Sequence, residues 1–319
     1  MTERTSTDVL GEPYEAETIR FPPDEEGPVV ATLVRRRTPG TAVGAVLHVH
    51  GFSDYFFQTE LADWWVERGY DFYALDLRKC GRSRLPHQTA HYVDDLHEYD
   101  ADLDASWHRI TERDGHSRVV ISAHSTGGLV TTLWASERGY ELAGMALNSP
   151  WFDLQGPALL RGPGTSAIKR VAGRRPRVEF KRKVEGYYTR RLHRDLEGEW
   201  DFDLDLKPEG SFPVYLGWLA AIRHGHDRLH AGLDVRGPVL VLSSDATQLT
   251  PSGPDDESIN THDIVLDVEQ IRRWSVAVGR HVTYVAVPSA IHDVFLSAKP
   301  VRDRAYDELE RWHSAYVSG

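Results

Sequence analysis

The chain has 319 residues, of which 40% are hydrophobic and 27% charged, and its formal net charge at pH 7 is −11. This is the composition of a globular protein with a substantial core, and the negative charge argues against non-specific nucleic-acid binding. The single cysteine, Cys80, excludes an intramolecular disulfide. No apolar stretch could span a bilayer and no signal-peptide pattern is present, so we expect a cytoplasmic protein without an integral membrane segment.

Apolar, β-branched runs alternate with helical patterns along most of the chain. Strands are predicted at residues 29–35, 43–49, 71–75, 118–123, 143–147, 239–243 and 282–287, with an edge strand at 18–21. Helices are predicted at residues 60–68, 91–113, 128–137, 265–278 and 301–316. This alternation predicts an α/β fold, in which helices flank a mostly parallel, twisted sheet on both faces.

The alternation breaks between residues 151 and 235. This stretch is longer than a connecting loop, so we predict a largely helical insertion, with residues 1–150 and 236–319 forming the core. Residues 161–194 are rich in Arg and Lys, which could steer anionic substrates or form a solvated helical face. The aromatic residues of the insertion could line an apolar pocket or pack within it: Phe180, Tyr187, Tyr188, Trp200, Phe202, Phe212, Tyr215 and Trp218.

The most informative segment is residues 119–128, where an apolar strand runs directly into a helix. The small residues Ala123 and Gly127 let the backbone turn sharply, which leaves the Ser125 side chain exposed on a strained elbow. The free N–H groups of the following helix favour developing negative charge. Ser125 is therefore a candidate acyl-transfer nucleophile. The alternative is an ordinary strand-to-helix turn whose serine caps the helix.

A serine nucleophile needs a base and an acid that orients the base. His292 follows the last predicted strand, at the sheet edge where catalytic groups collect in open α/β folds; otherwise it is a surface-loop histidine. The acid should lie between the strand at 239–243 and His292. Asp245 directly follows that strand, Asp263 opens the next predicted helix, and Asp267 is a third option. Asp245 could instead be a turn residue and Asp263 a helix cap.

The segment after the strand predicted at 43–49 suits an oxyanion hole. Gly51 permits a sharp turn, so the N–H of Phe52 can point toward the nucleophile, and the N–H of Thr126 supplies a second donor. His50 precedes the nucleophile in the chain and is better suited to structural hydrogen bonding than to acting as the base. The substrate pocket beside the nucleophile is expected to be lined by His50, Gly51, His124 and Trp151.

Three histidines, His224, His226 and His230, have a spacing that loosely suits metal ligands. No paired carboxylate or cysteine completes a site there, so we expect no metal. The serine chemistry described above also needs no organic cofactor.

Five motifs follow one another in a defined order. They are His50-Gly51-Phe52 with Asp54, the loop Asp76-Leu77-Arg78-Lys79-Cys80-Gly81-Arg82-Ser83, the elbow Ala123-His124-Ser125-Thr126-Gly127, the segment Asp263-Ile264-Val265-Leu266-Asp267, and Ile291-His292-Asp293. Together they resemble the α/β-hydrolase superfamily, most closely its monoacylglycerol lipase/lysophospholipase-like branch, also grouped with serine aminopeptidases. The resemblance runs from residue 42 to the C-terminus, and the insertion corresponds to the family's cap. Ala123 departs from the usual glycine, and Lys79-Cys80 replaces Gly-His.

The resemblance implies a Ser125–His292–Asp263 triad and favours Asp263 over Asp245, which stays an alternative because of the extra sequence at 246–262. It implies hydrolysis of a small-molecule ester with an apolar acyl group, such as a monoacylglycerol or lysophospholipid. The alternatives are amide hydrolysis or acyl transfer by the same triad, and a non-catalytic, ligand-binding member of the fold. The oligomeric state is not predicted.

Overall fold

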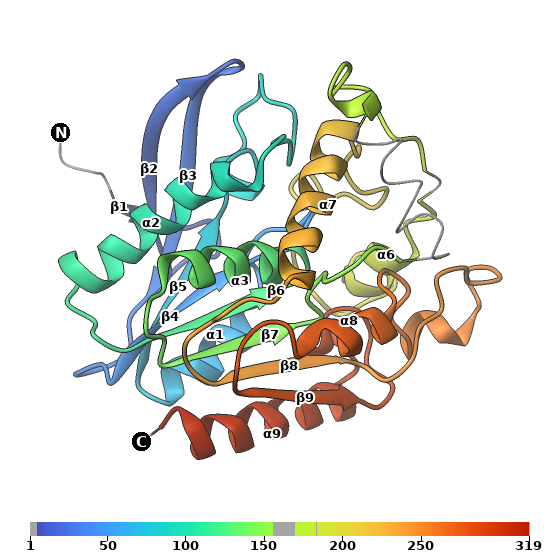
Figure 1. Ribbon diagram of the computed structural model, residues 1–319. Helices are drawn as coiled ribbons and strands as arrows, with labels where there is room; N and C mark the ends of the chain where they lie inside the picture. The colour runs from blue at the N-terminus through green and yellow to red at the C-terminus, as the bar shows by residue number, and fades with distance from the viewer. Residues whose placement is uncertain (1–4, 156–169, 183, 319) are drawn as a thin grey trace.

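The computed structural model describes residues 5–155, 170–182 and 184–318. Their strands form a nine-stranded sheet in the order β1-β2-β3-β5-β4-β6-β7-β8-β9 (Figure 1). Parallel pairing joins β5, β4, β6, β7, β8 and β9, whereas β1, β2 and β3 form an antiparallel edge. The predicted α/β class with a mostly parallel sheet is therefore confirmed.

The strand bounds are β1 (Thr5–Thr7), β2 (Glu15–Asp24), β3 (Gly27–Arg36), β4 (Gly44–Val49), β5 (Tyr70–Asp76), β6 (Val119–His124), β7 (Gly144–Asn148), β8 (Val239–Ser244) and β9 (Val282–Val287). Seven of them match the strands predicted from apolar runs. The strand predicted at 18–21 is β2, which is longer than predicted because it pairs with β3 from Glu15 to Asp24. It is not the edge strand that was predicted, because β1 pairs with its other side. The short, exposed strand β1 carries no apolar run and was not predicted.

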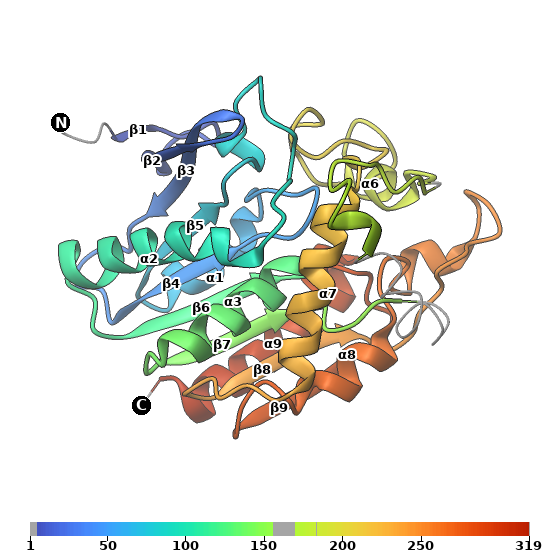
Figure 2. The same cartoon turned by 45° about the horizontal axis from the view of Figure 1, so that its top comes forward.

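Helices cover both faces of the sheet (Figures 1 and 2). One face carries α2 (Asp100–His108), α3 (Thr126–Arg138), α7 (Leu216–His230) and α8 (Val268–Ser275), and the other carries α1 (Thr59–Glu67) and α9 (Lys299–Tyr316). Successive strand residues point to opposite faces, so Leu47 packs in the first core and Val46 in the second. No helix in the described part of the chain is long and apolar enough to cross a membrane.

Two helices begin later than predicted. The helix expected at 91–113 starts with a 3₁₀ turn (Leu96–Tyr99), continues as α2 and ends in a π-helical turn (Arg109–Arg113). It starts there because the Asp95 carboxylate accepts a hydrogen bond from the His97 N–H and caps the turn. The helix expected at 265–278 is α8, and its N-cap is Asp267 rather than Asp263.

The described part of the insertion lies at the carboxyl ends of the parallel strands (Figure 1). Its described residues include α6 (Tyr187–Leu192) and α7, joined by irregular segments. Residues 156–169 and 183, which include part of the basic stretch, lie outside the described residues. A buried ion pair between Lys207 and Asp54, at 2.8 Å, ties the insertion to the core. A second buried ion pair, Arg223 to Asp153 at 2.6 Å, lies within the insertion.

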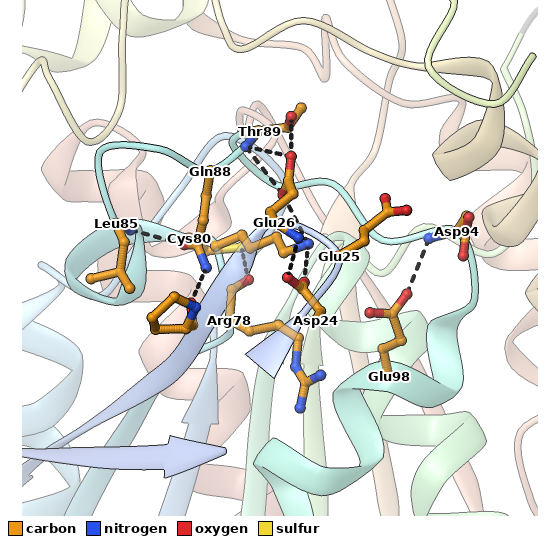
Figure 3. A network of polar contacts seen from close by, with 12 residues as sticks. Asp24, Glu25, Glu26, Arg78, Cys80, Leu85, Gln88, Thr89, Asp94 and Glu98 are labelled. Carbon is orange, nitrogen blue, oxygen red and sulfur yellow. Dashed lines mark hydrogen bonds and ion pairs between the residues drawn. The ribbon is translucent and has the colours of Figure 1, made fainter. Parts of the chain in front are cut away.

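The loop that departs from the family pattern at Lys79 is held by buried charge. Lys79 has a φ of 62°, in the region that favours glycine. Its ammonium, on a side chain only 3% exposed, lies 2.6 Å from Asp24 Oδ2 and 3.0 Å from Glu26 Oε2. Glu26 also accepts hydrogen bonds from Thr89 Oγ1 at 2.6 Å and from Arg177 of the insertion at 2.7 Å. Figure 3 shows Asp24 and Glu26 of the hairpin close to this loop, with Thr89 beside Glu26. The hydrogen bond from Arg177 to Glu26 connects the hairpin to the insertion.

From these contacts we predict that Glu26 makes the free energy of unfolding depend on pH. Burial would raise the pKa of Glu26, but hydrogen bonds from Thr89, Lys79 and Arg177 lower it from 4.5 to about 2. A carboxyl group whose pKa is lower in the folded protein than in the unfolded chain stabilises the fold when the pH is above its unfolded pKa. This contribution is lost as the pH falls toward the folded pKa. Glu26→Gln should therefore be less stable than wild type at neutral pH, and the difference should shrink between about pH 5 and pH 3. Urea unfolding over this range measures it.

The matched control is Glu25→Gln on the same hairpin. Glu25 also pairs with Arg177, but its side chain is 70% exposed, so the change should cost at most about 1 kcal/mol. If the difference in unfolding free energy between wild type and Glu26→Gln stays constant from pH 7 to pH 3, the lowered pKa of Glu26 is contradicted.

Candidate active site

The turn between β6 and α3 holds Ser125 in a strained conformation, with φ 52° and ψ −118°. Hydrogen bonds fix it: Ser125 N donates to Asn148 O, and Trp151 N donates to Ser125 O, both at 3.0 Å. A Cβ added at Gly127 would lie 2.4 Å from the carbonyl oxygen of His50. Only glycine therefore lets α3 start this close to the end of β4, and Ser125 is carried directly beside the segment that follows β4.

Ser125, His292 and Asp263 form a continuous hydrogen-bonded chain. The hydroxyl of Ser125 lies 3.1 Å from His292 Nε2, and His292 Nδ1 lies 2.8 Å from Asp263 Oδ2. In this network Nδ1 donates to the carboxylate, which leaves Nε2 as the acceptor for the serine proton. All three residues are buried, with Asp263 0% exposed. Their positions after β6, β8 and β9 follow from the parallel sheet, because the carboxyl ends of the strands share one edge.

Asp263 reaches this place because the loop after β8 folds back on itself. Asp263 N donates to Ala246 O at 2.9 Å, and Gln248 N donates to Asp263 O at 3.0 Å. The extra sequence at 246–262 therefore leaves Asp263 beside the end of β8. Its second carboxylate oxygen, Oδ1, accepts hydrogen bonds from the N–H groups of Val265 and Leu266 at 2.8 and 2.7 Å.

The structure gives the two other acid candidates different contacts. Asp245 is exposed, and its carboxylate accepts a hydrogen bond from the Ser289 N–H at 2.9 Å. Asp267 caps α8 by accepting from the Glu269 N–H at 3.1 Å. Neither makes the contact with His292 that Asp263 makes.

The peptide between Gly51 and Phe52 lies against the nucleophile. A Cβ added at Gly51 would be 3.0 Å from Ser125 Cβ, so the backbone passes close to the serine. His50 Nδ1 donates to Gly51 O at 2.7 Å, and its Nε2 accepts from the Leu77 N–H at 3.2 Å. Because the peptide is planar and trans, a fixed Gly51 carbonyl also fixes the direction of the Phe52 N–H. His50 is buried and both of its ring nitrogens bond to backbone groups, so it holds this backbone in place.

Aromatic side chains from the core and the insertion meet beside Ser125. The ring centroid of Trp218 on α7 lies 4.4 Å from that of Phe52 and 5.7 Å from that of Trp151. The ring centroid of His124 lies 4.8 Å from that of His292. Burial lowers the pKa of His124. The insertion also contributes Tyr188, whose ring lies 5.8 Å from that of His292.

Lys207 is a site residue that the sequence did not reveal. It comes from the insertion, and its Nζ lies 2.8 Å from Asp54 Oδ1, two residues after Phe52. Burial alone would raise the pKa of Asp54, but the Lys207 charge reverses this and holds the pKa well below its ordinary value. No local pattern could identify this contact, because it joins segments more than 150 residues apart.

Two further sets of residues have side chains that could carry chemistry. Cys80 is buried, and burial raises the pKa of its thiol well above the ordinary value, so it is a poor nucleophile. Among the described residues, His97, Asp100 and Glu137 lie close enough together to hold a metal. Arg228 pairs with Glu137 and donates to His97, and Arg138 pairs with Asp100, so arginines already satisfy these groups.

The sheet order and the serine elbow are those of the α/β-hydrolase fold. The profile of the family described as serine aminopeptidase, S33, matches residues 40–296. The chain therefore belongs to the serine aminopeptidase S33 family. No curated protein sequence matches it.

Solved structures share the fold across nearly their whole length. A soluble variant of monoglyceride lipase from Saccharomyces cerevisiae, in complex with a substrate analog, has a TM-score of 0.69 at 16% identity, covering 99% of this chain and 98% of that chain. A monoacylglycerol lipase from Paleococcus ferrophilus has a TM-score of 0.64 at 19% identity, covering 88% and 98%. A thermostable carboxyl esterase from Bacillus coagulans, in complex with glycerol, has a TM-score of 0.64 at 14% identity, covering 95% and 99%. At these identities the likeness concerns the fold.

Proposed function

We propose that this protein is a serine hydrolase that cleaves carboxylic esters through an acyl-enzyme. The observation that carries the proposal is the hydrogen-bonded chain from Ser125 through His292 to Asp263. A strained serine elbow and an oriented Phe52 peptide beside it supply the other parts that acyl transfer needs.

In the first half of the reaction, Ser125 Oγ attacks the ester carbonyl carbon while His292 Nε2 takes the serine proton. The Asp263 carboxylate holds the imidazole through Nδ1 and stabilises the positive charge that forms on the ring. The N–H groups of Phe52 and Thr126 stabilise the carbonyl oxygen as it becomes an oxyanion. The C–O bond to the alcohol then breaks, and His292 gives the leaving alcohol its proton.

In the second half, water replaces the alcohol. His292 Nε2 takes a proton from the water as it attacks the acyl carbon, and the same two N–H groups stabilise the oxyanion. Collapse of this intermediate returns the proton to Ser125 and releases the carboxylic acid. The residues named carry every proton transfer, so the steps need no cofactor.

The proposed substrate class is inferred from the aromatic side chains beside the nucleophile. Phe52, Trp151 and Trp218 present apolar rings, which suit an acyl chain rather than a charged group. Monoacylglycerol or lysophospholipid esters fit this description. We also propose that residues 1–150 and 236–319 form the catalytic core and residues 151–235 a cap over it.

Amide hydrolysis is the second candidate, because the family is described as serine aminopeptidase. An aminopeptidase needs acidic groups for the substrate amine. Asp54, an acid close to the oxyanion segment, is already paired with Lys207, which favours the ester.

A p-nitrophenyl ester series, from acetate to palmitate, tests the proposal. Wild type should turn over these esters, and Ser125→Ala should lose at least about a thousandfold in kcat because the nucleophile is gone. The preferred chain length measures the acyl pocket. Circular dichroism of the variant checks that the fold is retained.

A folded wild type that cleaves no ester but cleaves an aminoacyl p-nitroanilide would replace the ester proposal with the amide one. Turnover of neither substrate, or full turnover by folded Ser125→Ala, would overturn the serine-hydrolase proposal.

A matched pair of substitutions tests the acid. Asp263→Asn should lower kcat by about 10² to 10⁴-fold, because the amide no longer holds His292 in the reactive tautomer or stabilises its charge. Asp245→Asn, at an exposed carboxylate, should stay within about threefold of wild type. Kinetics on the best ester of the series measure both. The reverse pattern would make Asp245 the acid.

A further inference from the structure

Asn148, the last residue of β7, touches the segments that carry both the nucleophile and the base. Its backbone carbonyl oxygen accepts hydrogen bonds from Ser125 N at 3.0 Å and from His124 Nδ1 at 3.1 Å. This backbone contact holds the serine elbow against β7.

The side chain of the same residue holds the loop of the base. Asn148 Nδ2 donates to Asp293 Oδ1 at 2.6 Å, and Asn148 Oδ1 accepts from the Val294 N–H at 3.1 Å. Asp293 and Val294 directly follow His292 in the chain. One residue of a central strand is therefore hydrogen-bonded to both sides of the Ser125–His292 contact.

Asp293 is a carboxylate with an unusual setting. It is 2% exposed, and no lysine or arginine pairs with it within residues 5–155, 170–182 and 184–318. Hydrogen-bond donors satisfy it instead: Asn148 Nδ2, the Phe295 N–H at 3.1 Å and Gln58 Nε2 at 3.4 Å. A buried carboxylate without such donors is strongly disfavoured, so the loop adopts the conformation in which Asp293 reaches them.

We propose that Asn148 and Asp293 act together as positioning residues, setting the distance between His292 Nε2 and Ser125 Oγ. The inference rests on the proposed function. Asp263 orients the imidazole ring, whereas the Asn148–Asp293 pair fixes the backbone that follows His292. Loops are the mobile part of a fold, and a misplacement of about 1 Å can cost about a hundredfold in rate. Because Asn148 is hydrogen-bonded to the segments that carry Ser125 and His292, it limits the movement of one relative to the other.

The experiment exchanges the amide and the carboxylate. Asn148→Asp has nearly the same shape but sets two carboxylates against each other, so it should lower kcat at least about tenfold with KM within about twofold. Adding Asp293→Asn restores a donor and an acceptor and should recover most of the loss. Asn148→Ala removes the contact without adding charge and should also lower kcat.

The matched control is Ser149→Ala, the next residue along the chain. The Ser149 side chain is fully buried, and its hydroxyl has no hydrogen-bond partner within the described residues, so its loss should leave kcat within about twofold. If Asn148→Asp does not fold, Asn148→Ala and the exchanged pair carry the comparison. Folded Asn148 variants with wild-type kcat, or an exchanged pair no better than Asn148→Asp, would overturn the inference.

A second readout separates this inference from the proposed function. In wild type the proton on His292 Nδ1, hydrogen-bonded to Asp263, should give a downfield proton NMR signal, which needs no substrate. It should broaden or shift in Asn148→Asp and return in the exchanged pair. If wild type hydrolyses no ester, the proposed function fails, but the NMR comparison still decides the inference: a signal identical in all variants overturns it.

Discussion

The backbone of Ser125 is the constraint on which the rest of the site depends. Its φ of 52° is unfavourable for a residue with a side chain, so surrounding contacts must hold it. Asn148 O and Trp151 N bond it from the β7 side. On the β4 side, Gly127 leaves space for the carbonyl of His50, because any Cβ there would collide with it. The elbow exists only because β4, β6 and β7 end at the same level, and that same edge receives His292 and Asp263.

Buried charge keeps these loops in place. The Asp263 carboxylate is hydrogen-bonded to two backbone N–H groups and to His292. The Asp54 carboxylate pairs with Lys207, and the Asp293 carboxylate accepts a hydrogen bond from Asn148. Removing one partner from a buried ion pair such as Lys207–Asp54 typically costs about 3–5 kcal/mol. A buried carboxylate that loses a hydrogen-bond donor, as Asp263 or Asp293 would, is also destabilised. These hydrogen bonds are already formed without a substrate, which is what the proposed mechanism needs as charge develops. Lys207 links the insertion to the segment that follows β4, through an ion pair with Asp54 as well as through apolar packing.

Local patterns predicted much of this arrangement. Apolar runs located seven strands, and the strand-to-helix junction at Ser125 and the position of His292 after the last strand follow from chain order. The choice between Asp245 and Asp263 needed family resemblance, because the closure of the 246–262 loop depends on backbone contacts that residue types do not encode. The contacts of Lys207 and Asn148 join segments about 150 residues apart in sequence, so no local pattern could predict them.

The most direct test of the account is covalent labelling with a fluorophosphonate, read by mass spectrometry of the intact protein and its peptides. A polarised serine beside an imidazole should give one adduct, on Ser125, and His292→Ala should slow its formation by about 10² to 10⁴-fold, because the serine then keeps its proton. An unlabelled but folded wild type, an adduct on another residue, or equal labelling rates in wild type and His292→Ala would contradict the account.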